Sequence, residues 1–287
     1  MKTETDQAER KLKKTACGIR RNIIKMLTES KSGHTGGSLS AVDILTSLYF
    51  YKMRYKPSEP YWTDRDRFVL SKGHAAPALY AVLSEAGYFP KEELATLRKL
   101  GSRLQGHPDR RKLPGVEAST GSLGQGISIA CGIALCGKHI DKKSYRVYAL
   151  LGDGENQEGE VWEAAMSAAH YHLDNLCAVL DYNGLQIDGK VLDVMNIDPI
   201  SDKWRAFGWN VMEADGHSIG ELTKVLDEAE TVKGRPSIII AKTIKGKGVS
   251  FMEGKVKYHG TAPTYEECEK GLCELDEYEK NINREGA

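Results

Sequence analysis

The chain has 287 residues, of which 40% are hydrophobic and 28% are charged, so it is long enough to bury the core of one large or two small globular domains. Forty basic residues balance forty acidic ones without a long basic run, which gives no electrostatic reason to expect nucleic acid or an anionic membrane as a partner. The charged first fourteen residues, and the absence of any apolar stretch of roughly 18 residues, predict neither a signal peptide nor a membrane span.

Helical and extended patterns alternate along the chain. Apolar spacing predicts helices over residues 6–30, 42–51, 75–86, 126–137, 155–171 and 219–232. Short apolar runs predict buried strands over residues 68–70, 147–151, 176–180, 210–214 and 237–241. We therefore expect an α/β fold with a central, mostly parallel sheet and helices on both faces. The glycine- and proline-spaced stretch 101–119 is predicted to be a long loop, a kind of segment that is often functional.

The last segment, 264–287, differs in composition from the preceding 263 residues. It holds eight acidic and three basic residues, and its apolar residues are spaced as on one face of a helix. We therefore divide the chain into a domain over 1–263 and an acidic, helical carboxyl-terminal tail over 264–287. The solvated acidic face of such a helix needs no function of its own.

The six cysteines form no CxxC pair and have no histidine at zinc-ligand spacing. They lie at positions 17, 131, 136, 177, 268 and 273. We interpret all of them as reduced core thiols of a cytoplasmic protein.

Residues 151–184 contain the most informative pattern in the chain, a strand–helix–strand unit. A Gly-Asp-Gly triplet ends the first strand, and the second strand ends at Asn183, with 28 residues between Gly154 and Asn183. In a parallel sheet, Asp153 and Asn183 reach the same carboxyl edge, where open α/β sheets bind ligands. Alternatively, the two turns only end the strands of a sheet and bind no ligand.

The residue types at these turns suit a magnesium diphosphate site. Mg²⁺ takes octahedral oxygen ligands, commonly one or two from the protein and the rest from phosphate and water. Asp153 can supply a carboxylate oxygen, Asn183 an amide oxygen and Leu185 its backbone carbonyl oxygen. The glycines that flank Asp153 let the backbone approach phosphate closely.

Four of the eight histidines lie in glycine-rich turns. They are His34, His74, His107 and His259. Imidazole near neutral pH can donate, accept and shuttle protons, which suits a site that handles hydroxyl and carbonyl oxygens. A single turn histidine is more often a surface or backbone-bonding residue, but four are harder to dismiss. The other four histidines, at positions 139, 170, 172 and 217, are interpreted as structural or exposed.

Taken together, these motifs resemble the amino-terminal half of transketolase, from about residue 10 to about residue 263. They are SGHTGGSLS at 32–40, LSKGHAAPALY at 70–80, LQGHPD at 104–109, TGSLGQGI at 120–127, the Gly-Asp-Gly unit, IAKTIKGKG at 240–248 and YHG at 258–260. The resemblance implies the thiamine-diphosphate-binding fold. It also implies thiamine diphosphate and Mg²⁺ as cofactors, with Ca²⁺ or Mn²⁺ as substitutes for Mg²⁺.

The resemblance assigns roles to the histidines and to one glutamate. His34, His107 and His259 would hold substrate oxygens, with His259 also near the cofactor. His74 would lie nearest the diphosphate and the reacting carbon of the cofactor. Glu158 resembles a family glutamate that lies at the subunit interface near the catalytic glutamate of the partner, or else it is an ordinary carboxylate at a helix start.

Further cofactor contacts are implied by the same resemblance. Gly121, Ser122 and Leu123 would lie against the aminopyrimidine, with the leucine under the bent cofactor. Ile187 would pack on the rings, and Gly154 would lie beside the diphosphate. Lys245 would approach the diphosphate, as an ammonium group near an anion should; otherwise it is a solvated loop cation.

Thr35 departs from the family pattern, because many transketolases have proline after the first histidine. We expect the change to loosen or reshape this turn and to affect the choice of acceptor sugar.

The family's catalytic glutamate belongs to a second, pyrimidine-binding domain that these motifs do not include. The resemblance therefore implies a split transketolase, in which this chain is the diphosphate-binding subunit. The chain is expected to be inactive alone, because a separate chain supplies the pyrimidine-binding and carboxyl-terminal domains. We expect a heterotetramer with two copies of each chain. Its reaction would move a two-carbon ketol unit from a ketose phosphate to an aldose phosphate, in cytoplasmic pentose phosphate metabolism.

Three alternatives remain open from the sequence. One is a subunit of another split thiamine enzyme, either deoxyxylulose phosphate synthase-like or the alpha subunit of a 2-oxo acid dehydrogenase. Another is a transketolase for an unusual sugar. The third is a cofactor-binding scaffold or regulatory subunit without turnover.

Overall fold

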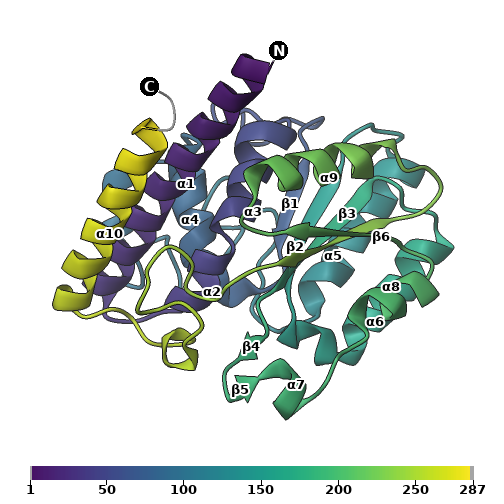
Figure 1. The fold of residues 1–287 in the computed structure, drawn as a ribbon. Helices are drawn as coiled ribbons and strands as arrows, with labels where there is room; N and C mark the ends of the chain where they lie inside the picture. Colours follow the sequence, from purple (N-terminus) through teal and green to yellow (C-terminus); the bar gives the residue numbers. More distant parts are fainter. Residues whose placement is uncertain (1, 285–287) are drawn as a thin grey trace.

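The computed structural model describes residues 2–284, in which a parallel sheet lies between two layers of helices (Figure 1). The sheet order is β1-β2-β3-β7-β6, and every neighbouring pair is parallel. The strands are β1 (Arg67–Leu70), β2 (Val147–Gly152), β3 (Leu176–Tyr182), β6 (Asn210–Asp215) and β7 (Ser237–Lys242). This confirms the predicted α/β class and the parallel sheet. A separate antiparallel hairpin is formed by β4 (Leu185–Gln186) and β5 (Gly189–Lys190).

The central strands are apolar on both sides because helices cover both faces of the sheet. Successive side chains of β2 point to opposite faces, so that Leu150 and Leu151 enter two different cores. The first core contains residues of α1 (Lys2–Ser30), α3 (Val42–Ser47), α4 (Ala76–Glu85) and α9 (Ile219–Thr231). The second core contains residues of α5 (Gln125–Leu135), α6 (Gly159–His170) and α8 (Ile200–Ala206). The predicted placement of helices on both faces is therefore confirmed.

Several short elements were not predicted from the sequence. Among them are α2 (Thr35–Ser40), α8 and the β4–β5 hairpin, which is followed by the single helical turn α7 (Val191–Val194). Two adjacent glycines give α2 poor helix propensity. All six of its residues are buried, so packing against neighbouring elements outweighs the local preference.

The predicted helix over residues 155–171 begins later than expected. A 3-10 turn at Gly154–Gln157 comes first, Glu158 is extended, and α6 starts at Gly159. The side chain of Asp153 accepts a hydrogen bond from the backbone N–H of Gly154 and so begins the turn. Because the 3-10 turn comes before α6, the residues that follow Asp153 stay at the edge of the sheet.

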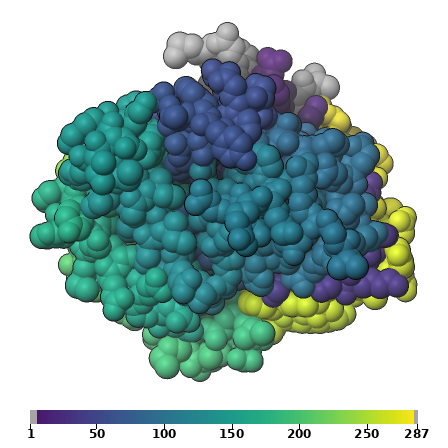
Figure 2. Space-filling model, turned by 180° about the vertical axis from the view of Figure 1, so that it is seen from behind, coloured from purple at the N-terminus to yellow at the C-terminus, as the bar shows by residue number. Residues whose placement is uncertain are grey.

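Residues 265–284 form the predicted terminal helix, α10 (Tyr265–Arg284), which packs along α1 (Figure 1). Its apolar face is buried through Leu275 and Ile282. Seen from the opposite side, most of the surface belongs to the blue and teal segments of the first half of the chain, and the yellow α10 shows at one edge (Figure 2). None of the helices within residues 2–284 combines the length and the apolar composition that a membrane span requires.

The prediction that all six cysteines are core residues is wrong for two of them. Cys17, Cys131, Cys177 and Cys268 are buried, as predicted. Cys136 is only partly buried, and Cys273 is exposed. Cys273 shares α10 with the buried Cys268 but lies off the packed face, because residues five apart in a helix do not share one stripe.

Candidate active site

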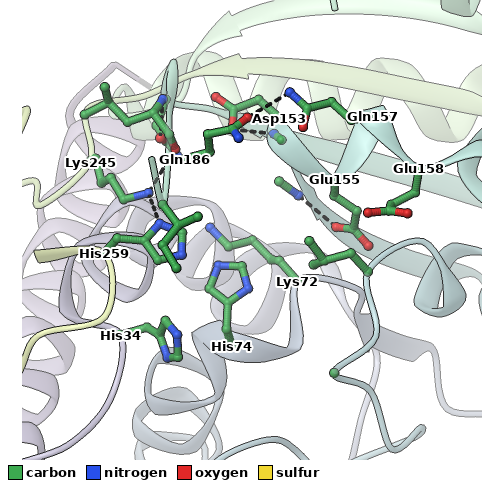
Figure 3. Close-up of a pocket in the computed structure, with 17 residues that line it drawn as sticks. His34, Lys72, His74, Asp153, Glu155, Gln157, Glu158, Gln186, Lys245 and His259 are labelled. Atoms are coloured by element: carbon green, nitrogen blue, oxygen red, sulfur yellow. Dashed lines mark hydrogen bonds between the residues drawn. The ribbon is translucent and has the colours of Figure 1, made fainter. Parts of the chain in front are cut away.

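The loops that follow β1, β2, β3 and β7 meet at the carboxyl edge of the sheet and line a cavity of about 300 Å³. Most of the predicted site residues line this cavity (Figure 3). They are His34, His74, Gly121, Leu123, Asp153, Gly154, Glu158, Asn183, Leu185, Ile187, Lys245 and His259. Two predicted residues do not line it. Ser122 and His107 are both exposed to solvent, and the ring centroid of His107 lies 6.4 Å from that of His34.

Asp153 lies at the bottom of the cavity and is 2% exposed. Its two carboxylate oxygens accept hydrogen bonds from the backbone N–H groups of Gly154 and Gly184, so that the turn after β2 and the turn after β3 are joined. Burial, followed by the negative charge of Asp181, raises the pKa of Asp153 to about 6. A carboxylate held in this way is stabilised by a cation.

The three residues predicted as metal ligands, Asp153, Asn183 and Leu185, all line this cavity. The side-chain oxygen of Asn183 accepts from the backbone N–H of Leu185 at 3.1 Å. The described residues contain no group of three or more His, Cys, Asp or Glu side chains suited to a metal. A metal held by the predicted residues would have one carboxylate, one amide and one carbonyl oxygen as protein ligands, which would leave coordination positions for phosphate and water oxygens. That mixed oxygen set fits Mg²⁺.

Lys245 reaches the cavity from the loop after β7 and is 2% exposed. Its ammonium group donates to the carbonyl oxygen of Leu185 at 2.9 Å and to Nδ1 of His259 at 2.8 Å (Figure 3). Burial, followed by the nearby charge of Lys72, lowers the pKa of Lys245 to about 8. Lys245 is therefore not a solvated loop cation but a buried ammonium group beside the proposed diphosphate position.

A second buried lysine, Lys72, was not singled out from the sequence, although it belongs to the LSKGHAAPALY motif at 70–80. Its ammonium group forms an ion pair with Asp181 and donates to the carbonyl oxygen of Gly37 at 3.0 Å. Asp181 also accepts hydrogen bonds from the hydroxyls of Ser40 and Thr243. Burial opposes ionisation, but Lys72 and these hydrogen bonds keep the pKa of Asp181 low. The sequence signal that could have indicated this ion pair is Asp181 itself, a charged residue near the end of the otherwise apolar strand β3.

Glu155 was also missed, and it connects two glycine turns. Its carboxylate accepts hydrogen bonds from the backbone N–H groups of Gly124 and Gly152, at 2.9 and 3.0 Å, and from the hydroxyl of Ser71. Gly124 has a φ of +86°, which glycine adopts without strain. The carboxylate thus fixes the turn that carries Leu123 against the turn that carries Asp153.

At the other end of the cavity the histidines gather (Figure 3). The ring centroid of His34 lies 5.2 Å from that of His74 and 5.6 Å from that of His259, and His74 and His259 are stacked at 5.5 Å. Nδ1 of His34 is buried and has no hydrogen-bond partner. An unpaired buried nitrogen is costly unless a ligand satisfies it.

All four turn histidines favour the neutral imidazole. Burial and the Arg98 guanidinium lower the pKa of His34 to about 4. Partial desolvation and the same guanidinium lower the pKa of the more exposed His107. Burial and Lys245 lower the pKa of His259 to about 3, and burial and Lys72 lower the pKa of His74 well below its ordinary value. A neutral imidazole keeps one donor and one acceptor nitrogen, so it can bond either a hydroxyl or a carbonyl oxygen.

Thr35 is buried as the first residue of α2, and its hydroxyl donates to the carbonyl oxygen of Thr261 at 2.8 Å. The contact joins the turn of His34 to the segment that follows His259. The hydroxyl provides a tether that proline has no group to make, and the effect of Thr35 on the choice of acceptor sugar stays a prediction.

Two predicted residues lie at the mouth of the cavity. Glu158 is exposed and makes no side-chain capping bond to α6. Ile187, on the β4–β5 hairpin, is 63% exposed. Both therefore leave surface free toward the opening of the cavity.

The chain matches one family model and many known proteins. The model, described as the transketolase, thiamine diphosphate binding domain, matches residues 12–274. The 6-deoxy-6-sulfo-D-fructose transketolase subunit SqwG of Clostridium sp. (strain MSTE9) is 46% identical over 260 residues, which cover 89% of this chain and 94% of that protein. One of the subunits of the apulose-4-phosphate transketolase of Phocaeicola vulgatus is 42% identical over 266 residues, which cover 93% of this chain and 94% of that protein.

Longer proteins match through only part of their length. Human transketolase is 49% identical over 250 residues, which are 87% of this chain but 39% of that protein. The solved transketolase from Leishmania mexicana superimposes with a TM-score of 0.87 at 31% identity, over 96% of this chain and 45% of that chain. The chain thus spans less than half the length of these proteins. From the family match, the identities and the fold, the chain belongs to the transketolase family and corresponds to its thiamine diphosphate-binding domain.

Proposed function

We propose that this chain is the thiamine diphosphate- and Mg²⁺-binding subunit of a two-chain transketolase, which transfers a two-carbon ketol unit from a ketose phosphate to an aldose phosphate. The observation that carries the proposal is one cavity that combines the oxygen ligands at Asp153 and Asn183 with neutral histidines. The extent of the similarity supports it further, because the two relatives named as subunits are matched over 94% of their length.

In this proposal the two ends of the cavity bind different parts of the ligands. Asp153, the amide of Asn183 and the carbonyl of Leu185 hold Mg²⁺, and Lys245 and Gly154 lie against the diphosphate. When bound, thiamine diphosphate supplies the carbanion stabilisation that the reaction needs. Buried, preformed groups favour binding because little ordering is left to complete when the ligand arrives.

The histidines would orient the sugar. Nδ1 of His34 has an unsatisfied position that a sugar hydroxyl can fill. Because Lys245 donates to Nδ1 of His259, the proton of that neutral ring is on Nε2, which leaves a donor for an oxygen. His107, whose ring centroid lies 6.4 Å from that of His34, would bond a more distant part of the substrate. Holding the reactants in place is the contribution that these residues make to the rate.

The partner in this proposal is a separate chain with the pyrimidine-binding and carboxyl-terminal domains, in a cytoplasmic heterotetramer with two-fold symmetry. Glu158 and Ile187, at the open mouth of the cavity, would face that partner and the cofactor rings. The names of the subunit relatives, which mark them as parts of larger enzymes, support a partner chain.

A second candidate keeps the same chemistry but uses an unusual sugar in place of pentose phosphates. It is favoured by the two subunit relatives, whose names specify 6-deoxy-6-sulfo-D-fructose and apulose 4-phosphate. The family match favours either transketolase over a deoxyxylulose phosphate synthase-like enzyme or a 2-oxo acid dehydrogenase.

The test is to co-purify the chain with candidate partner chains and to assay ketol transfer with thiamine diphosphate, Mg²⁺ and pairs of sugars. Pentose phosphates and a sulfonated ketose separate the two candidates. Activity is expected only in the mixture; full activity of this chain alone would contradict the split enzyme. Asp153→Ala is expected to abolish Mg²⁺-dependent cofactor binding, and an unchanged affinity would refute the metal assignment.

A further inference from the structure

The turn that carries Lys245 is held from outside the cavity by a histidine. Nδ1 of His217 lies 2.8 Å from a carboxylate oxygen of Asp43, and the backbone N–H of Ile244 donates to Nε2 of His217 at 2.8 Å. Because an N–H group can only donate, Nε2 has to accept, so the ring proton sits on Nδ1 and is donated to Asp43. The hydrogen bonds therefore select one neutral tautomer of His217.

The same carboxylate holds the other end of the turn through an arginine. The two terminal nitrogens of Arg20 donate to the two oxygens of Asp43, and Nε of Arg20 donates to the carbonyl oxygen of Lys247 at 3.1 Å. The side chains of Arg20 and Asp43 are 5% and 8% exposed. Asp43 thus reaches both flanks of Lys245, at Ile244 through His217 and at Lys247 through Arg20.

The fit between the turn and its supports is close. Gly248 has a φ of +94°, and a Cβ there would lie 2.8 Å from Cδ of Arg20. On the cavity side, the N–H of Gly246 donates to the carbonyl oxygen of Gly36 at 3.0 Å, and a Cβ on Gly36 would lie 2.9 Å from Cγ of Lys245. The stem of Lys245 is therefore confined between the turn and α2.

The supporting residues come from three separate elements and do not line the cavity of Lys245. Arg20 belongs to α1, Asp43 to α3, and His217 to the loop before α9. They border a different cavity, of about 440 Å³. An effect of these residues on a ligand at Lys245 would therefore be transmitted through the turn.

We propose that Arg20, Asp43 and His217 are positioning residues that fix the turn over residues 244–248 and thereby hold the Lys245 ammonium group at the diphosphate. The inference rests on the proposed function, in which Lys245 contacts the diphosphate. A lysine side chain loses much conformational freedom when it is held in one place. Because the backbone of residues 244–248 is already fixed in the folded chain, part of this entropy is lost before the cofactor binds, and the affinity for the cofactor is higher.

The experiment is a double-mutant cycle on the full chain together with its partner chain, with the dissociation constant of thiamine diphosphate in the presence of Mg²⁺ measured by calorimetry. Lys245→Ala is expected to raise that constant by roughly tenfold or more, the usual loss for a charge-assisted hydrogen bond. His217→Phe keeps the ring volume without the two nitrogens and is expected to raise the constant by about three- to tenfold. The double variant is expected to bind no more weakly than Lys245→Ala alone, because His217 acts through Lys245.

Two further variants separate positioning from general stability. His217→Gln retains a side-chain acceptor for the N–H of Ile244 and a donor for Asp43, so it is expected to bind close to the wild type. Asp66→Asn alters a buried carboxylate at the opposite edge of the sheet and is expected to lower the melting temperature without changing the dissociation constant.

The outcomes distinguish the inference from the function beneath it. If Lys245→Ala weakens binding but His217→Phe does not, His217 has no positioning role and the inference is overturned. If the losses from the two single variants add fully in the double variant, His217 acts independently of Lys245, and the inference is also overturned. If Lys245→Ala changes nothing, or if the wild type does not bind thiamine diphosphate, the proposed function fails and the inference fails with it.

Discussion

Buried carboxylates lie at both edges of the five-stranded sheet, but their surroundings differ. At the amino edge, Asp66 accepts hydrogen bonds from the backbone N–H groups of Arg54 and Arg146 and from the Arg54 guanidinium, so a cation compensates its charge. At the carboxyl edge, the hydrogen bonds that Asp153 accepts from residues 2–284 come from backbone N–H groups, and its pKa is raised. One edge is arranged for stability of the chain alone, and the other keeps unbalanced charge for a ligand.

The comparison shows how a site and a scaffold share one sheet. Asp181 lies one residue inside the carboxyl edge, and its charge is neutralised by Lys72. Asp153 and Lys245, nearer the cavity, are left with pKa values displaced toward their neutral forms. Displaced pKa values of this kind gather at functional sites, where a bound ligand can compensate a charge that the folded chain alone leaves poorly stabilised.

The largest effect is expected from breaking the ion pair at the carboxyl edge. Lys72→Met would leave Asp181, which is fully buried, without its cation, and is expected to lower the free energy of unfolding by about 3–5 kcal/mol. Urea unfolding without cofactor measures the loss. The matched change at the amino edge, Asp66→Asn, keeps one acceptor oxygen and is expected to cost only about 1–3 kcal/mol. Equal losses at the two edges would contradict the ranking.

Removing the charge of Asp153 is expected to raise the free energy of unfolding, whereas breaking the ion pair of Lys72 lowers it. Because the pKa of Asp153 rises from 3.8 to about 6 on folding, ionisation destabilises the folded chain above pH 6 and has no such effect below about pH 4. Asp153→Asn is therefore expected to remove a penalty of at most about 3 kcal/mol at pH 7. Because the amide keeps one acceptor oxygen for the N–H groups of Gly154 and Gly184, about 1 kcal/mol of this gain is lost again, and a smaller net stabilisation of the cofactor-free chain is expected.

The measurement for Asp153→Asn is thermal unfolding at pH 7, with and without thiamine diphosphate and Mg²⁺. The variant should gain stability without the ligands and lose the further rise that they give the wild type. A destabilised variant in the absence of ligands would show that the carboxylate is structural, like Asp66.

The smallest effect is expected at the histidine end of the cavity, as a change of pH dependence. The folded pKa of His34 is about 4, below its ordinary value of 6.5, so the unfolded chain takes up a proton first when the pH falls. The contribution of neutral His34 to the free energy of unfolding is therefore fully present above pH 6.5 and is lost as the pH falls toward 4. His34→Phe cannot titrate, and its free energy of unfolding should fall less steeply between pH 7 and pH 5. Parallel curves for the variant and the wild type would contradict this assignment.

Much of the site was predictable from short stretches of sequence, because the loops after parallel strands share one edge. The Gly-Asp-Gly unit predicts that Asp153 and Asn183 meet, and both line the cavity. The turn histidines stand out by their glycine neighbours, since glycine marks backbone that approaches a ligand or another segment closely. The ion pair of Lys72 and Asp181 was not predicted, because its two residues are 109 positions apart and neither position shows a local pattern that depends on the other.

The sequence by itself determined the alternation of helices and strands, the α/β class and the family, because hydrophobic periodicity and compact motifs are local properties of the chain. Tertiary structure alone decided the strand order β1-β2-β3-β7-β6, the helical form of the glycine-containing α2 and the tether from Thr35 to Thr261. It also decided that His217, which in sequence was one more loop histidine, supports the turn of Lys245. These features depend on contacts between residues far apart in the chain, and such contacts exist only once the sheet and its two helical layers have assembled.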